Sequence, residues 1–377
     1  MHQDFLERAK IMLNEYLLKT EELFVANKND WFTDFFGHFQ SVCAEIVKLQ
    51  NESTLPAISY LEYTMLRANF INRQYLSEVF LYCDRQYLDK KQCLVGEYDI
   101  SFLFVYFDEL WNKLLSERKR YVGKVKAREI TYFMMESLPD FYSYLANIAR
   151  FAIVECVDKS PFLDIKKNDI FRVSVGEYMA KTEPIFTESK HKSTRKLVDW
   201  FDEHLYHEYI FGDYSDLDFS EKVFDYIDFR YARFQNSHFN NTVFNGSILI
   251  GANFRNAIME GCKLDNCSIF ETDFSNALLR NASLTNTAAK AGLPDEKKWK
   301  YVGFLPASFH NSDLTSANFS GANLTGADFT GAILTNTDFT NAVLNHVNFT
   351  NAVLVGANFT GAITENAIFD SSIDRKE

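Results

Sequence analysis

The chain has 377 residues, of which 47% are hydrophobic and 24% are charged, a composition typical of a globular protein with room for two domains. Its net charge of −12 argues against a general nucleic-acid-binding protein, so we expect no direct nucleic-acid binding. The N-terminus is charged where a signal peptide is apolar, and no stretch approaches a membrane span, so we expect a cytoplasmic protein. The six cysteines show no CxxC motif and are interpreted as reduced thiols.

Residues 1–212 contain several segments with apolar residues at helical spacing, among them 4–24, 58–82 and 101–120. This pattern predicts an all-α domain of six to eight helices packed as a bundle. The helical domain is expected to end at residue 212, where a different pattern begins.

The helical half contains one cluster of residue types that occur in catalytic and metal-binding motifs. Glu203, His204, His207 and Glu208 lie close together in the sequence, but their spacing differs from HExxH, and a surface helix is the simpler interpretation. No phosphate-binding glycine loop and no nucleophile motif occurs. We therefore expect no catalytic residues, no cofactor and no metal, and a protein that is not an enzyme.

Residues 113–129 form a basic segment in an acidic protein. Two glutamates, Glu117 and Glu129, face seven cations, which gives a local charge of about +5. The segment is either a solvated helix end or a docking site for an acidic partner, which could be the acidic solenoid of a second copy. The cations are Lys113, Arg118, Lys119, Arg120, Lys124, Lys126 and Arg128.

The C-terminal half repeats every five residues. From 219 to 289 and from 309 to 369, 26 of 28 positions at this spacing, which we call the central positions, are Phe, Leu, Ile or Met. From Ala232 onward a small residue stands two places before each of them. A period of five fits neither a helix nor a strand, so the pattern predicts a solenoid in which each pentad forms one side of a coil. Phe and Leu alternate from 309 onward, which indicates an even number of sides, with two Phe stacks facing two Leu stacks.

The pentads "ANLTG", "ADFTG" and "ANFSG" resemble the A(D/N)Lxx signature of the pentapeptide repeat family. The resemblance covers about residues 214–373. It implies a right-handed quadrilateral β-helix, here of about seven coils. The expected architecture is thus an α+β multidomain chain, with an all-α helical bundle over 1–212 and a pentapeptide repeat β-helix over 213–377.

Residues 290–306, "KAGLPDEKKWKYVGFLP", interrupt the repeat. They form either a degenerate coil, with Trp299 at a central position, or a loop that leaves one side of the solenoid. The two prolines and the lysines favour the loop insertion. A protruding basic loop is a candidate contact surface, with Lys297, Lys298 and Trp299 as its residues.

Several positions just before a central residue are apolar where Asp or Asn is usual. Ile333 and Val353 should stack on one side, and Val343 and Ile363 on the opposite side, with Ile368 near the end. These stacks are either a partner or self-association surface or tolerated substitutions in the pleat.

These features favour a non-catalytic protein–protein interaction or adaptor protein, with a rigid solenoid and a helical recognition domain. Two alternatives stay open: a DNA-mimicking modulator of a DNA-processing enzyme such as gyrase, as in quinolone-resistance members of the resembling family, and an accessory subunit of an enzyme with a pocket in the helical domain. The segment 301–373 has no Lys or Arg, but its acids are few. The expected partner is a protein of unknown identity, and a homodimer could form through the C-terminal coil.

Overall fold

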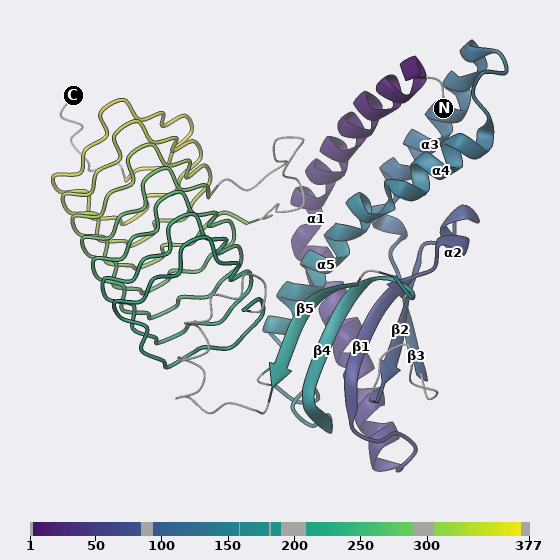
Figure 1. Ribbon diagram of the computed structural model, residues 1–377, viewed down its shortest axis with the longest axis horizontal. Helices are drawn as coiled ribbons and strands as arrows, with labels where there is room; N and C mark the ends of the chain where they lie inside the picture. The colour runs from purple at the N-terminus through teal and green to yellow at the C-terminus, as the bar shows by residue number, and fades with distance from the viewer. Residues whose placement is uncertain are drawn as a thin grey trace. The chain divides into compact units, whose positions relative to one another are not determined.

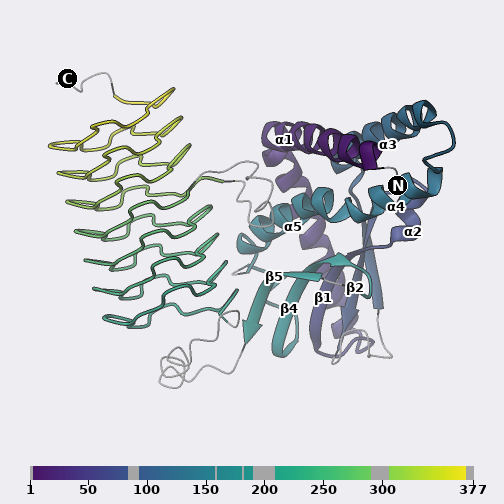
Figure 2. The ribbon, with the colours of Figure 1, turned by 45° about the horizontal axis from the view of Figure 1, so that its top comes forward.

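The computed structural model describes residues 3–83, 93–157, 159–180, 182–189, 209–289 and 305–370 (Figure 1). The chain divides into two compact units, Met1–His191 and Lys192–Glu377. The first unit combines helices with one sheet, and the second is a solenoid of short repeated coils (Figure 2).

The N-terminal unit begins with one long helix, α1 (Gln3–Asn51). Its buried residues recur every three or four positions, as at Phe5, Ala9, Met12 and Tyr16, which is the stripe expected of an amphipathic helix. The other helical segments are α2 (Arg67–Ile71), η2 (Ser101–Leu103), α3 (Val105–Glu117), η3 (Arg118–Tyr121), α4 (Ala127–Glu136) and α5 (Leu138–Val154).

Five strands form a mixed sheet in the order β3-β2-β1-β4-β5. β1 and β4 are parallel, and the other neighbouring pairs are antiparallel. The strands are β1 (Ile58–Met65), β2 (Leu76–Tyr82), β3 (Cys93–Asp99), β4 (Lys167–Glu177) and β5 (Thr182–Ser189).

Helices α1 and α5 pack on the same face of this sheet. The ring of Tyr63 in β1 lies 5.1 Å from Phe35 of α1, and the Tyr142 hydroxyl of α5 donates to the Tyr63 carbonyl oxygen at 3.2 Å. Tyr63 and Phe35 are completely buried. This aromatic contact is therefore central to the core of the N-terminal unit.

The prediction of an all-α helical bundle is wrong, because residues 58–82 contain β1 and β2, joined by the short helix α2, rather than one long helix. Every residue of β1 except Tyr60 is buried, so the burial along this strand does not alternate as it does in a half-exposed strand. In the sequence, Ile58, Leu61 and Met65 also fit helical spacing, so periodicity alone does not distinguish this strand from a buried helix. The β-branched and aromatic residues were the remaining signal for a strand.

The C-terminal unit is a β-helix with 20 residues, or four pentads, in each regular coil. Parallel bridges join equivalent positions, such as Asp328 to Asn348 and Ile333 to Val353. The corner of each pentad has a positive φ, as at Asn336 and Gly331, which explains why Asn and Gly recur there.

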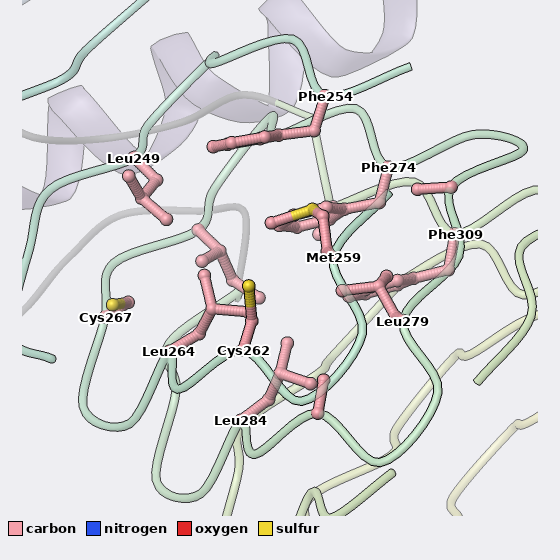
Figure 3. Close-up of a cluster of buried hydrophobic side chains, with 14 of the residues drawn as sticks. Leu249, Phe254, Met259, Cys262, Leu264, Cys267, Phe274, Leu279, Leu284 and Phe309 are labelled. Atoms are coloured by element: carbon pink, nitrogen blue, oxygen red, sulfur yellow. The ribbon is translucent and has the colours of Figure 1, made fainter. Parts of the chain in front are cut away.

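The predicted stacks of Phe and of Leu on alternate sides are confirmed, and the two Phe stacks face each other rather than the Leu stacks. Phe309 stacks on Phe329 with ring centroids 4.7 Å apart, while Phe319, two pentads from Phe309, meets it edge-on at 5.5 Å. The leucines at 314 and 324 are completely buried between these stacks. Figure 3 shows the continuation of one stack through Phe254, Phe274 and Phe309.

Small polar residues two places before the central position are buried but satisfied. The Thr242 hydroxyl donates to the Phe219 carbonyl oxygen at 2.7 Å, and the Thr337 hydroxyl donates to that of Leu314 at 2.9 Å. Each bond joins one coil to the preceding one. A hydroxyl is tolerated inside the core because it has this partner.

The bridge spacing changes once. Ser268 pairs with Ala288, 20 residues on, whereas Asp273 pairs with Ser308, 35 residues on. Fifteen residues are therefore added between neighbouring coils, and Phe309 stacks directly on Phe274 at 5.0 Å. A degenerate coil would have paired Asp273 with residue 293, so that interpretation is wrong; residues 290–304 themselves lie outside the described ranges.

Candidate functional site

The predicted apolar stack at 333 and 353 belongs to a longer column on one side of the β-helix. Ile333 and Val353 are 40% and 44% exposed, and Ile258 and Leu278 on the same side are half-buried. We call this set of bridged positions the Ile333 column; it comprises Asp218, His238, Ile258, Leu278, Asp313, Ile333 and Val353.

One carboxylate interrupts the apolar part of the Ile333 column. Asp313 accepts hydrogen bonds from Arg280 Nε at 2.7 Å and from the Thr315 hydroxyl at 2.7 Å. Burial opposes its ionisation, but the hydrogen bonds from Thr315 and Arg280 outweigh burial and lower the pKa of Asp313. The carboxylate charge of Asp313 is thus neutralised by the neighbouring guanidinium of Arg280.

The opposite side carries the second predicted pair. Val343 and Ile363 are bridged, as predicted, with Val343 half-buried and Ile363 54% exposed. This column is polar at Ser268 and Asn323, so its apolar part is shorter. Ile368, 55% exposed, lies on a third side, where it is bridged to Asn348. The five predicted residues are therefore distributed over three sides.

Three other predicted contact residues, Lys297, Lys298 and Trp299, lie outside the described ranges, as do the residues of the 203–208 cluster. Within the described residues, no group of three His, Cys, Asp or Glu side chains could hold a metal ion. None of the helices in the described ranges combines the length and the apolar character needed to span a membrane.

The predicted basic segment forms η3 and the connection from α3 to α4. Arg120 donates to Glu117 at 2.9 Å, and the same carboxylate binds Arg8 of α1 at 2.9 Å. Glu129 accepts a hydrogen bond from the backbone N–H of Lys126 at 2.7 Å and so caps α4. Both glutamates of the segment are thus engaged locally.

A depression of about 520 Å³, open to solvent, lies between α1 and β3 and was not predicted from the sequence. Its wall includes Tyr98, whose hydroxyl donates to Asp34 at 2.9 Å, and His38, whose ring lies 4.8 Å from that of Tyr98. Burial lowers the pKa of His38, and the smaller effect of Asp34 opposes this shift. The strand that carries Tyr98 was not predicted, and without it no sequence pattern brings these side chains together.

Four of the six thiols are buried. Burial raises the pKa of Cys156 to about 11 and that of Cys262 to about 12. Burial likewise raises the pKa values of Cys43 and Cys267. A thiol with a raised pKa supplies little thiolate, which is the reactive form.

Iodoacetamide at pH 8 is therefore expected to modify Cys83 and Cys93, which are partly exposed, and to leave the four buried thiols intact. Peptide mass spectrometry of the folded protein measures this, and denaturation in urea should make all six thiols reactive. Rapid modification of a buried thiol in the folded protein would contradict the packing described here.

Two family models match the C-terminal unit: a pentapeptide repeat region at residues 302–374, and pentapeptide repeats in eight copies at residues 227–266. Residues 227–374 are therefore a pentapeptide repeat region, and the predicted resemblance is confirmed. No family is recognised for the N-terminal unit.

Among solved structures, the chain is similar to HetL, a pentapeptide repeat protein involved in heterocyst differentiation regulation from Nostoc sp. strain PCC 7120, at 17% identity over 48% of this chain and 100% of that one, with a TM-score of 0.19. It is also similar to QnrB1, a plasmid-mediated fluoroquinolone resistance protein, at 17% identity over 43% and 81% with a TM-score of 0.27. A third similar structure is Rfr23 from Cyanothece 51142, at 17% identity over 46% and 99% with a TM-score of 0.16. The search of curated proteins gave no match.

Proposed function

We propose that this protein is a non-catalytic interaction protein whose β-helix presents the Ile333 column to a protein partner. The observation that supports the proposal is the set of aliphatic side chains at 258, 278, 333 and 353 along one side, where Asp313, paired with Arg280, stands between Leu278 and Ile333. At about 4.8 Å for each coil, this stripe is about 19 Å long. Single exposed apolar residues are ordinary on a protein surface, but a stripe of them is typical of an interface.

The shape of this side also favours a protein partner over a small ligand. Each bridged position stands directly beside the next coil, so the column is a ridge of half-exposed side chains on a regular surface. Small-molecule sites are concave and surround their ligand. A repetitive, regular surface of this kind suits a partner that docks along its length.

The alternative of DNA mimicry has less support. The acids Asp313, Asp328 and Asp338 belong to three different columns, and Asp313 is paired with Arg280. A DNA mimic would need rows of unpaired acids spaced like phosphates. Competition by duplex DNA for a captured partner would revive this alternative.

Two further proposals concern other parts of the molecule. The depression beside His38 is the place where an accessory subunit could bind a ligand.

The last described coil is the candidate surface for self-association. Its core residues Leu354, Phe359 and Phe369 are only partly buried, and a second copy could cover them.

Affinity capture with the full chain tests the interaction proposal. The variant Ile333→Lys/Val353→Lys should bind its partner at least tenfold more weakly, about 1.4 kcal/mol, because charges would replace an apolar contact. Val343→Lys/Ile363→Lys makes the same change on the opposite side and should retain binding. Equal retention of the partner by both variants would refute the proposed docking face.

A further inference from the structure

The connection between α3 and α4 forms a basic tip, which we define as residues 118–128. Helices α3 and α4 run side by side and meet at this tip, at the end of the N-terminal unit away from the sheet (Figures 1 and 2). Its cations are Arg118, Lys119, Arg120, Lys124, Lys126 and Arg128.

Most of these cations are not neutralised by their surroundings. Glu117 is shared by Arg120 and Arg8, and Glu129 caps the backbone of α4. Within the described part of the chain, no ion pair forms at the other five cations of the tip, and all of these except Arg118 are classed as exposed. The tip thus carries a concentrated positive charge that is available to a partner.

An apolar residue stands among these charges. Val122 is 86% exposed, the highest exposure of any large hydrophobic residue in the described ranges. The neighbouring residues hold the turn from inside, since Val125 is buried and the Tyr121 ring meets Phe5 of α1 edge-on at 5.2 Å. Gly123, with a φ of +75°, permits the reversal of the chain. Val122 is therefore presented to solvent by a turn that is packed into the core.

The size and shape of the tip decide between possible partners. A stable protein interface needs about 800 Å² on each partner, more than one turn offers. An extended nucleic acid would also meet the rest of a chain with a net charge of −12. A membrane surface can contact the tip alone. At physiological salt the electrostatic attraction to anionic lipids is screened beyond about 8 Å, so it acts only on the residues nearest the surface. An apolar apex surrounded by cations suits the headgroup boundary, where the valine can leave water.

We propose that the basic tip docks this protein, weakly and reversibly, on membrane surfaces that carry anionic lipids. Each cation near such a surface contributes about a fivefold factor in the partition coefficient. The tip by itself therefore gives transient attachment. This inference is independent of the proposed role of the Ile333 column.

Co-sedimentation of the full chain with vesicles tests this proposal. Binding is expected to vesicles of phosphatidylcholine with phosphatidylserine at physiological salt. It should vanish with phosphatidylcholine alone and in about 1 M salt, where the Debye length falls to about 3 Å. Failure to bind the phosphatidylserine vesicles even at low salt would overturn the proposal.

Variants locate the contact. Lys119→Gln/Lys124→Gln should lower the partition coefficient about 25-fold, and Val122→Ser should lower it about fivefold. Lys159→Gln/Lys166→Gln removes the same charge from exposed positions outside the tip and should leave binding unchanged. An equal loss in both lysine variants would overturn the tip as the contact. Loss of a captured acidic protein on mutation of the tip, with vesicle binding unchanged, would assign the tip to a protein instead.

Discussion

Replacing Phe329 with alanine is expected to lower the free energy of unfolding of the β-helix by about 4 kcal/mol. Phe329 is completely buried and stacks on Phe309 at 4.7 Å and on Phe349 at 5.4 Å. It also meets Phe319 and Phe339 edge-on at 5.8 Å and 5.9 Å. The regular backbone ladder cannot collapse around the missing ring, so the cavity persists and its cost is added to the lost apolar burial. Urea denaturation followed by far-ultraviolet circular dichroism measures the effect.

Phe369→Ala is the matched control, because Phe369 belongs to the same stack but is only partly buried in the last described coil. We expect it to cost less than about 2 kcal/mol, since less area is lost and a smaller cavity forms. Equal effects of the two substitutions would contradict a core that is filled by continuous stacks.

Phe35→Ala is expected to lower the free energy of unfolding of the N-terminal unit by about 4 kcal/mol. Phe35 is completely buried, and its ring lies 5.1 Å from Tyr63 and 5.2 Å from Tyr98. It therefore joins α1 to two strands of the sheet at once. Hydrogen exchange of β1 amides reports the loss, because opening of the sheet exposes them.

Phe36→Ala provides the comparison on the same helix. Phe36 is partly exposed and its ring lies 6.1 Å from Phe32 of the same helix. Its removal should cost less than about 1.5 kcal/mol and leave exchange in β1 nearly unchanged. If Phe36→Ala were as damaging as Phe35→Ala, the face of α1 that packs on the sheet would be misassigned.

The β-helix was predictable because one local rule generates the whole structure. A bulky residue every fifth position, with a small residue two places earlier, specifies both the interior and the turn at every corner. The alternation of Phe309 and Leu314 even determines which sides face each other. No long-range information is needed to place such a residue.

The sheet of the N-terminal unit was not predictable in this way. The parallel partner of β1 is β4, about one hundred residues further along the chain. The apolar residues Ile58, Leu61 and Met65 of β1 also fit helical spacing, so the local sequence is compatible with either a helix or a strand. The pairing with β4 that selects the strand is not visible locally.

The candidate site was predicted only in its C-terminal part. A coil period of 20 residues correctly pairs Ile333 with Val353. The same period, continued towards the N-terminus, would align Ile333 with Asp273 and Asn253. Fifteen inserted residues shift the register, so the structure aligns Ile333 with Leu278 and Ile258 instead. This shift brings the four aliphatic residues onto one side and so determines the length of the apolar stripe. Neither the composition nor the five-residue period of the sequence reveals it.

Photo-crosslinking in native lysate tests the central claim, that the Ile333 column is the docking face. A photoreactive amino acid is introduced in place of Ile333 or Val353, which occupy neighbouring coils, and in place of Val343 on the opposite side. We predict one common protein adduct from positions 333 and 353 and none from position 343. Adducts of equal yield from all three positions, or from position 343 alone, would contradict the account.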